Sequence, residues 1–193
     1  AGEDVVRNDK LGEMVFLPDN TAAIAGAQNM IVDTETGKTN GRVSKSRGYR
    51  ALAVSANATR YTAGDFQKLP GRRGVTLSAE DAEGKTLWTR NFAGEKAMTI
   101  DMLSASDERV CVAGRSNGTL HGQTLVGNND FYVACNNAQG TRVFTRLLPA
   151  ANMQLVEMKV NRRGNVVLVL QAGDKKNPDL LLYRIDSAGR IFQ

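Results

Sequence analysis

The stretch NDFYVACNNAQGTRVF, residues 129–144, decides the fold. It contains a short apolar run, a polar turn that ends in glycine, and a second β-rich segment that carries a phenylalanine. An apolar run of this length, rich in aromatic and β-branched residues, is typical of a buried strand. Asn and Gly between two such runs favour a tight turn. The stretch therefore predicts a β-hairpin.

The glycine in the turn of this hairpin has a counterpart in every quarter of the chain. The four glycines are Gly37, Gly84, Gly140 and Gly189, which by subtraction are 47, 56 and 49 residues apart. Repeats of roughly 40–50 residues made of short strands are typical of propeller blades. We therefore expect a single repeat domain over residues 1–193, with approximate repeats at 1–47, 48–93, 94–148 and 149–193.

The strand pattern sets the fold class. Alternation and β-branched enrichment predict up to four short strands in each repeat, among them strands at residues 49–54 and 98–103. Helical periodicity is nowhere sustained. The sequence thus predicts an all-β, β-propeller-like fold with four four-stranded antiparallel blades. Complete propellers typically have about four to eight blades, so four is the lower limit. Two arrangements remain open, a closed small propeller or part of a larger ring, which a homodimer could form.

The hairpin also resembles a known repeat. Residues 129–144 resemble the bacterial β-propeller repeats that read Asp-aromatic-Val-Ala, polar turn, Gly, and then a strand with an aromatic residue. Residues 80–89 are similar, with Trp88 where Phe144 stands, and residues 179–192 follow the pattern more loosely. The first repeat keeps the turn but lacks the aromatic. The resemblance implies the fold rather than an activity, because propellers support many functions.

Charge is distributed unevenly along the chain. Residues 1–37 carry a net charge of −5, residues 38–73 carry +8, and the whole chain carries +5. Such a polarised surface attracts acidic partners. Nucleic acid is a weaker expectation, since few aromatic residues are available for base stacking. An ordinary solvated surface is the alternative. The residues expected to form a basic, partner-binding face are Arg42, Lys45, Arg47, Arg50, Lys68, Arg72 and Arg73.

The two cysteines, Cys111 and Cys135, fall in two segments that we expect to pair as strands of one repeat. A disulfide is possible here if the two Cα atoms come within the usual separation of about 4.4–6.8 Å, and two buried free thiols are the alternative. Two cysteines and one histidine do not supply a zinc site by themselves. The sequence therefore predicts no metal and no cofactor.

The long loop that follows Gly114 is rich in Asn and Gly, and variable loops often carry function. It lacks the spacing of a calcium-binding EF-hand loop, and capped turns are the simpler interpretation. Trp88 and Phe144 fit either a sugar-stacking platform or packing between blades. The candidates for a ligand loop are Asn117, His121, Asn128, Asn129 and Asp130.

No catalytic motif is found, including the Gly-x-Ser-x-Gly turn of serine hydrolases. We therefore expect a non-catalytic binding or scaffold protein, an accessory subunit that presents its basic face to an acidic protein partner or larger complex. The alternative is a propeller that binds glycans or small ligands through its inter-strand loops. On this interpretation the protein is not an enzyme.

Two further features concern location. No apolar run approaches the roughly 18–20 residues of a membrane-spanning helix. The chain starts at Ala1 without an initiator Met, which indicates processing, and a removed signal peptide would account for it. We therefore expect an extracytoplasmic location, periplasmic or secreted.

Overall fold

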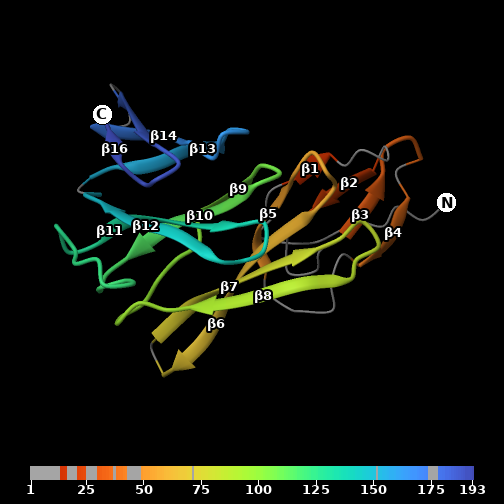
Figure 1. Ribbon diagram of the computed structural model, residues 1–193, viewed down its shortest axis with the longest axis horizontal. Helices are drawn as coiled ribbons and strands as arrows, with labels where there is room; N and C mark the ends of the chain where they lie inside the picture. The colour runs from red at the N-terminus through yellow and green to blue at the C-terminus, as the bar shows by residue number, and fades with distance from the viewer. Residues whose placement is uncertain are drawn as a thin grey trace.

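The computed structural model describes residues 14–16, 21–24, 30–36, 38–42, 49–70, 72–150, 152–173 and 178–193. No helix occurs among these residues, and so none there is long and apolar enough to cross a membrane. The strands form four antiparallel sheets of four strands each (Figure 1). The fold is therefore all-β and propeller-like, and we call the sheets blades 1 to 4.

The bounds of the strands follow the four repeats. Blade 1 contains β1 (Met14–Phe16), β2 (Thr21–Ile24), β3 (Met30–Asp33) and β4 (Thr39–Arg42). Blade 2 contains β5 (Tyr49–Val54), β6 (Arg60–Leu69), β7 (Arg72–Glu80) and β8 (Thr86–Phe92). Blade 3 contains β9 (Met102–Ala105), β10 (Arg109–Ser116), β11 (Asp130–Asn137) and β12 (Arg142–Leu148). Blade 4 contains β13 (Gln154–Val160), β14 (Val166–Gly173), β15 (Pro178–Ile185) and β16 (Ile191–Phe192).

Two strand expectations need correction. A strand expected over residues 98–103 begins only at Met102, and Met98 instead forms an isolated bridge with Ser116. Strand β4 was not expected, because its Thr-Asn-Gly-Arg sequence has the composition of a loop. It forms because β3 offers a free edge whose backbone groups need partners.

The blades are arranged as an open arc. The first strands of the blades, β1, β5, β9 and β13, lie next to one another in sequence order. Figure 1 shows blade 1 at one end of the arc and blade 4 at the other. No extensive packing joins these two blades among the described residues. The described blades thus form an open arc and show no closed four-bladed ring.

Side chains from alternate positions of β11 fill the spaces on both sides of blade 3. Tyr132 and Ala134 are buried against blade 2, whereas Phe131 and Val133 are buried against blade 4. Successive side chains of a strand point to opposite faces, so a strand covered on both faces is apolar throughout. This explains the uninterrupted apolar run in the sequence that defines the repeat.

One edge of the arc carries the tight turns between the third and fourth strands of blades 2, 3 and 4, at residues 81–85, 137–141 and 186–190, and we call it the turn edge. Each of these turns begins with Asp or Asn, whose side chain accepts backbone N–H groups from the turn. Gly140 and Gly189 adopt φ angles of 77° and 85°, which glycine reaches without steric cost. The repeated polar-Gly pattern therefore encodes the same turn three times.

Contacts between neighbouring blades repeat at the turn edge. The Trp88 indole donates a 2.7 Å hydrogen bond to the carbonyl of Ala138, and Arg90 donates to the carbonyl of Gly140. One blade further on, Phe144 packs against Gly189, whose carbonyl accepts from Arg146. Trp88 and Phe144 are only 8% and 5% exposed. Their interpretation as packing residues between blades is confirmed, and they form no sugar platform.

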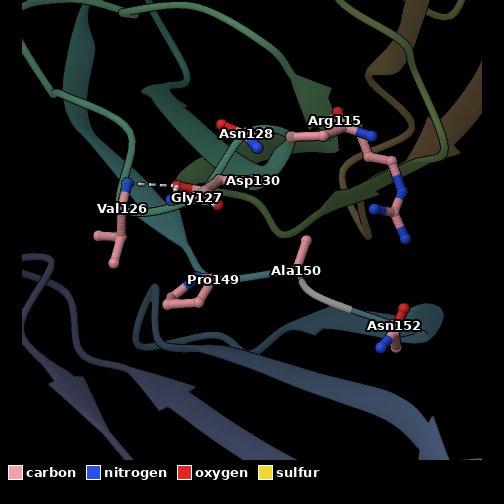
Figure 2. A pocket seen from close by; sticks show the side chains of 9 residues that line it. Arg115, Val126, Gly127, Asn128, Asp130, Pro149, Ala150 and Asn152 are labelled. Atoms are coloured by element: carbon pink, nitrogen blue, oxygen red, sulfur yellow. Dashed lines mark hydrogen bonds between the residues drawn. The ribbon is translucent and has the colours of Figure 1, made fainter.

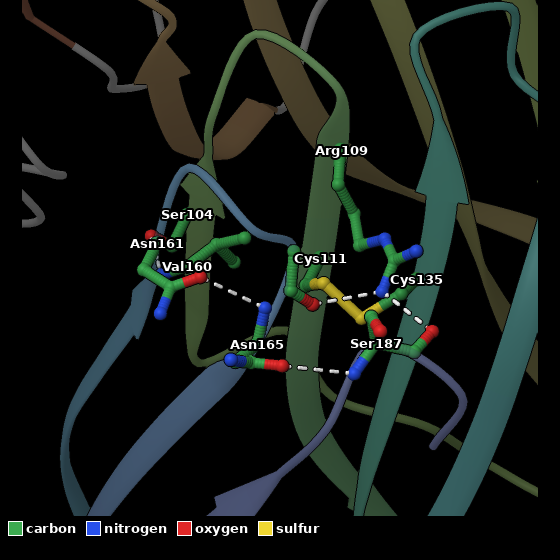
Figure 3. Close-up of a disulfide and its surroundings, with 9 residues drawn as sticks. Ser104, Arg109, Cys111, Cys135, Val160, Asn161, Asn165 and Ser187 are labelled. Atoms are coloured by element: carbon green, nitrogen blue, oxygen red, sulfur yellow. Dashed lines mark hydrogen bonds between the residues drawn. A yellow bond between two sulfur atoms is a disulfide. The ribbon is translucent and has the colours of Figure 1, made fainter.

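Arg109 adds a second connection at this edge (Figure 3). One nitrogen of its guanidinium donates to the carbonyls of Gly164 and Ser187, at 2.7 and 3.0 Å. Both acceptors belong to turns of blade 4, so a side chain of blade 3 fixes blade 4 at two points. Burial lowers the pKa of the Arg109 guanidinium from its ordinary value.

Candidate functional site

The edge opposite the turns carries the β10–β11 loop, residues 117–129, and the β12–β13 link, residues 149–153, and we call it the loop edge. A groove of about 520 Å³ lies there between blades 3 and 4 (Figure 2). An adjoining hollow of about 320 Å³ shares Arg115 and Asn152 with it. We treat the two as one interblade groove. Its polar lining comes from Arg115, Asn128, Asn129, Asp130, Asn152, Gln154 and Gln171.

Arg115 lies where the two parts of the groove meet. Its guanidinium stacks over the ring of Phe131, the residue opposite it on β11, at 4.3 Å. It also donates a hydrogen bond to the carbonyl of Met153 in the β12–β13 link. A guanidinium has five N–H donors, and no described carboxylate forms an ion pair with this one. Arg115 therefore brings a positive charge and unused donors to the groove.

Asp130 shapes one wall of the groove rather than offering a free carboxylate. Its side chain is buried and accepts hydrogen bonds from the backbone N–H of Val126, at 2.6 Å, and of Gly127, at 3.1 Å. These bonds fold the end of the β10–β11 loop back onto the start of β11. The neighbouring Asn128 and Asn129 are exposed at the groove. The carboxylate is thus used to hold the loop.

The candidate ligand loop is divided by the structure. Asn128, Asn129 and Asp130 line the groove, whereas Asn117 and His121 do not. Asn117 is exposed, and its backbone N–H donates to the carbonyl of Ala97. The five residues expected to act together therefore do not form one site.

His121 lies between blade 3 and the end of blade 2. Its Nδ1 is 2.8 Å from the Thr145 hydroxyl, and its ring centroid is 5.3 Å from that of Phe92. Burial, together with the positive charge of Arg142, lowers the pKa of His121 to about 4. The imidazole is therefore neutral at neutral pH and acts as a packing residue.

The basic face is only partly described. Lys45 and Arg47 lie outside the described residues, and only the backbone is described at Arg42, Lys68 and Arg72. Arg50 and Arg73 both approach the carboxylate of Asp65, the second at 3.8 Å. Asp65 is the one acid in residues 38–73, so it offsets part of the positive charge of that segment.

Cys111 and Cys135 form a disulfide across the paired strands β10 and β11, with Cα atoms 4.1 Å apart (Figure 3). Both sulfur atoms are in this disulfide, so neither residue supplies a reactive thiol. In the part of the chain that the structure describes, no three His, Cys, Asp or Glu side chains gather as they would to hold a metal ion.

Sequence reasoning missed the residue at the centre of the groove. Arg115 directly follows an Ala-Gly pair that has a counterpart in each of the other repeats. The residues after this pair in the other repeats are Ala27, Asp65 and Asp174. Arg115 is thus the one cation at this position among the four repeats, and this difference was the signal in the sequence that could have pointed to the groove. The groove itself also needs residues 149–154, which the sequence separates from Arg115 by more than thirty positions.

No protein family model and no curated protein matches this chain. Among solved structures, it is similar to a lignostilbene dioxygenase of Pseudomonas brassicacearum, with 12% identity and a TM-score of 0.61 over 95% of this chain and 45% of the other. It is also similar to a variant of an apocarotenoid oxygenase from Synechocystis, with 12% identity and a TM-score of 0.58 over 93% of this chain and 47% of the other. A third similar structure is a hydrazine synthase of Kuenenia stuttgartiensis, with 13% identity and a TM-score of 0.50 over 98% of this chain and 67% of the other.

These comparisons correct the functional expectation drawn from sequence. The non-catalytic scaffold or binding protein, with no enzymatic role, is contradicted because the solved structures that share the fold are named as enzymes. The chain spans about half the length of the two oxygenases. The physical reason for the error is that a propeller site is assembled from loops of several blades, so it leaves no local motif. At this level of identity the likeness itself establishes the fold.

Proposed function

We propose that the chain is the substrate-binding part of a propeller enzyme, and that the interblade groove binds the carboxylate of a small organic acid. The observation that carries the proposal is the guanidinium of Arg115 at the centre of the groove, where no described carboxylate pairs with it. The fold that the chain shares with oxygenases supports the enzyme class.

The chemistry of the groove matches an acid with an apolar body. A guanidinium recognises a carboxylate through paired N–H donors, which gives both strength and orientation. Val126, Pro149 and Ala150 offer apolar surface beside it. Because Arg115 is held by Phe131 and by the Met153 carbonyl, it loses little conformational freedom when a ligand binds. The groove is thus largely formed before its ligand arrives.

The described residues supply binding and no oxygen chemistry. Reaction with O₂ requires a metal or an organic cofactor. Among the described side chains, no set of metal-binding groups is gathered, and the one histidine of the chain is packed against Phe92 and Thr145. These residues therefore do not fit such a centre, and we assign no step of an oxygenation to them.

The test compares acids with their uncharged counterparts. Binding of benzoate, phenylacetate and cinnamate would be measured by ligand-observed NMR, beside benzamide, phenylacetamide and cinnamamide. We expect the acids to bind at least about tenfold more tightly, because only they can pair with the Arg115 guanidinium. Equal affinity for acids and amides would contradict the proposal.

A matched pair of variants locates the binding. Asn152→Asp keeps the size of the side chain and tolerates the positive φ at this position, while adding a negative charge to the groove lining. We expect it to abolish binding of the acids and to leave the melting temperature within a few degrees. Arg163→Gln removes an exposed cation from the 161–165 turn at the turn edge and should leave binding unchanged. Unaltered binding to Asn152→Asp would show that the acids bind outside the groove and would contradict the proposal.

A further inference from the structure

The interblade groove has room for a ligand that branches beside its carboxylate. Its two parts measure about 520 and 320 Å³, and each lies within the usual range for a small-molecule pocket. Arg115 and Asn152 line both parts, so the guanidinium assigned to the carboxylate lies where the two parts meet. An unbranched acid bound at this guanidinium fills one part only. An acid with two substituents on the carbon next to its carboxylate fills both.

The larger part suits an apolar substituent. Figure 2 shows Val126 and Pro149 well away from the guanidinium of Arg115, with Ala150 between them and Asn152. Contact of apolar groups with such surface is favourable because it removes both from water. The larger part therefore extends from a cation at one end to an apolar wall at the other.

The smaller part is lined by residues with amide side chains. Gln154 and Gln171 line it in addition to the two shared residues. They lie opposite each other on β13 and β14, so their side chains are neighbours on one face of the sheet. No hydrogen bond among the described residues uses either carboxamide. Each carboxamide offers N–H donors and a carbonyl acceptor. Such a pair complements the single N–H and single carbonyl of a secondary amide.

The charges of the groove disfavour a free ammonium group on the ligand. Among the described lining residues there is one cation, Arg115, and one carboxylate, that of Asp130. The Asp130 carboxylate already accepts the backbone N–H groups of Val126 and Gly127. An ammonium on the carbon next to the bound carboxylate would lie close to the guanidinium, and like charges brought together oppose binding. The groove therefore favours a second substituent that is polar and uncharged.

We propose that the ligand of the groove is an N-acyl α-amino acid with an apolar side chain, an inference that rests on the carboxylate site of the proposed function. Its carboxylate pairs with Arg115, and its side chain occupies the larger part. Its acyl amide forms hydrogen bonds with the carboxamides of Gln154 and Gln171 in the smaller part. Three different groups on one carbon are then held at three places, so the groove distinguishes the two enantiomers.

The first experiment measures the dissociation constants of three related acids by ligand-observed NMR. 3-Phenylpropanoate has the carboxylate and the apolar body, N-acetylphenylalanine adds the amide, and free phenylalanine adds an ammonium instead. We expect N-acetylphenylalanine to bind about tenfold more tightly than 3-phenylpropanoate, because it forms additional hydrogen bonds. Free phenylalanine should bind at least about fivefold more weakly than 3-phenylpropanoate. One enantiomer of N-acetylphenylalanine should bind at least about fivefold more tightly than the other.

The same series separates this inference from the proposed function. If 3-phenylpropanoate binds more tightly than 3-phenylpropanamide, but N-acetylphenylalanine gains nothing over it, the N-acyl amino acid is wrong and the carboxylate site stands. Equal binding of the two enantiomers would also overturn the inference, since the branched carbon would not be held. If neither acid binds more tightly than its own primary amide, the carboxylate site itself is wrong.

The second experiment tests the position of the acyl amide. A double variant, Gln154→Met with Gln171→Met, removes both carboxamides and nearly keeps the size of the side chains. We expect it to bind N-acetylphenylalanine only as tightly as 3-phenylpropanoate, whose own affinity stays unchanged and shows that the groove is intact. Gln139→Met is the matched control, because Gln139 is exposed in the 137–141 turn at the turn edge. A tenfold preference for N-acetylphenylalanine that persists in the double variant would overturn the inference.

Discussion

Neighbouring blades contact each other differently at the turn edge and at the loop edge of the arc. At the turn edge, carbonyls of residues 138–140 and of Gly189 accept hydrogen bonds from an aromatic or arginine of the preceding blade, and Arg109 fixes blade 4 at two further carbonyls. At the loop edge, blades 3 and 4 separate around a groove in which Arg115 donates to the carbonyl of Met153 in the β12–β13 link. The hydrogen bonds at the turn edge recur from one pair of blades to the next, whereas the groove at the loop edge belongs to blades 3 and 4.

This difference separates stability from function. Contacts that recur at equivalent positions, such as Trp88 with Gly140 and Phe144 with Gly189, are what stacking of repeats requires. A feature found in one repeat only, such as Arg115 in its groove, is not needed for stacking. Because loops at the end of a rigid scaffold are where binding residues concentrate, the loop edge is the place to search for function.

The largest expected effect is at the turn edge. Trp88→Ala removes a buried side chain that packs on Gly140 and donates to the Ala138 carbonyl. We expect a loss of about 3–5 kcal/mol in the free energy of unfolding, measured by denaturation in urea. Val126→Ala is the control at the loop edge, where the side chain is exposed, and should cost less than about 0.5 kcal/mol. Similar losses in both variants would remove the distinction between the edges.

The second expected effect concerns the strands that connect the two edges. The disulfide joins β10 to β11 across 24 positions of sequence, a segment that includes the whole β10–β11 loop. Replacing both Cys111 and Cys135 by Ala should lower the free energy of unfolding by about 3 kcal/mol, since the unfolded chain is no longer constrained. Acid binding in the groove should persist in the folded variant. If binding is lost while the fold is intact, the disulfide serves the groove rather than the scaffold.

The extracytoplasmic location expected from the sequence stays a prediction. Disulfides persist in oxidising compartments, so the Cys111–Cys135 pair agrees with that location. A comparison of the reduced and oxidised protein in urea would show how far stability depends on the compartment.

The sequence predicts the repeats well because the information is local. Turns beginning with Asp81, Asn137 and Asp186 need an Asx side chain and a glycine within four positions, and both are visible in the sequence. Strand β5 matches its expected bounds, and most other strands differ only at their ends. Packing of Trp88 and Phe144 between blades follows from their equivalent positions in the repeat.

The groove and the open arc could not be predicted in the same way. Arg115 approaches Met153 only because blade 4 folds against blade 3, and the angle between blades depends on side chains that fill the space between them. The same reasoning explains the error with the candidate loop, where His121 and Asn128 are seven positions apart yet only Asn128 reaches the groove. Loop conformation is set by contacts such as those of Asp130, which composition does not reveal.

The smallest expected effect is a pH dependence that arises from His121 in the β10–β11 loop. Its folded-state pKa of about 4 lies below the ordinary value of 6.5, because burial disfavours the charged ring. The neutral ring therefore contributes its full stability above about pH 6.5, and this contribution is lost as the pH falls towards 4. Because the ring is half-exposed, we expect this contribution to the free energy of unfolding to be only about 1 kcal/mol after solvent screening.

The measurement is the melting temperature at pH 7 and at pH 4.5, for the wild type and for His121→Asn. Other groups titrate in this range, including Glu80, whose raised pKa acts in the opposite direction, so the difference between the two proteins isolates the histidine. A smaller decrease of the melting temperature in the variant than in the wild type would show that stability depends on pH through His121. Equal decreases would show that the imidazole is as well solvated in the folded protein as in the unfolded chain.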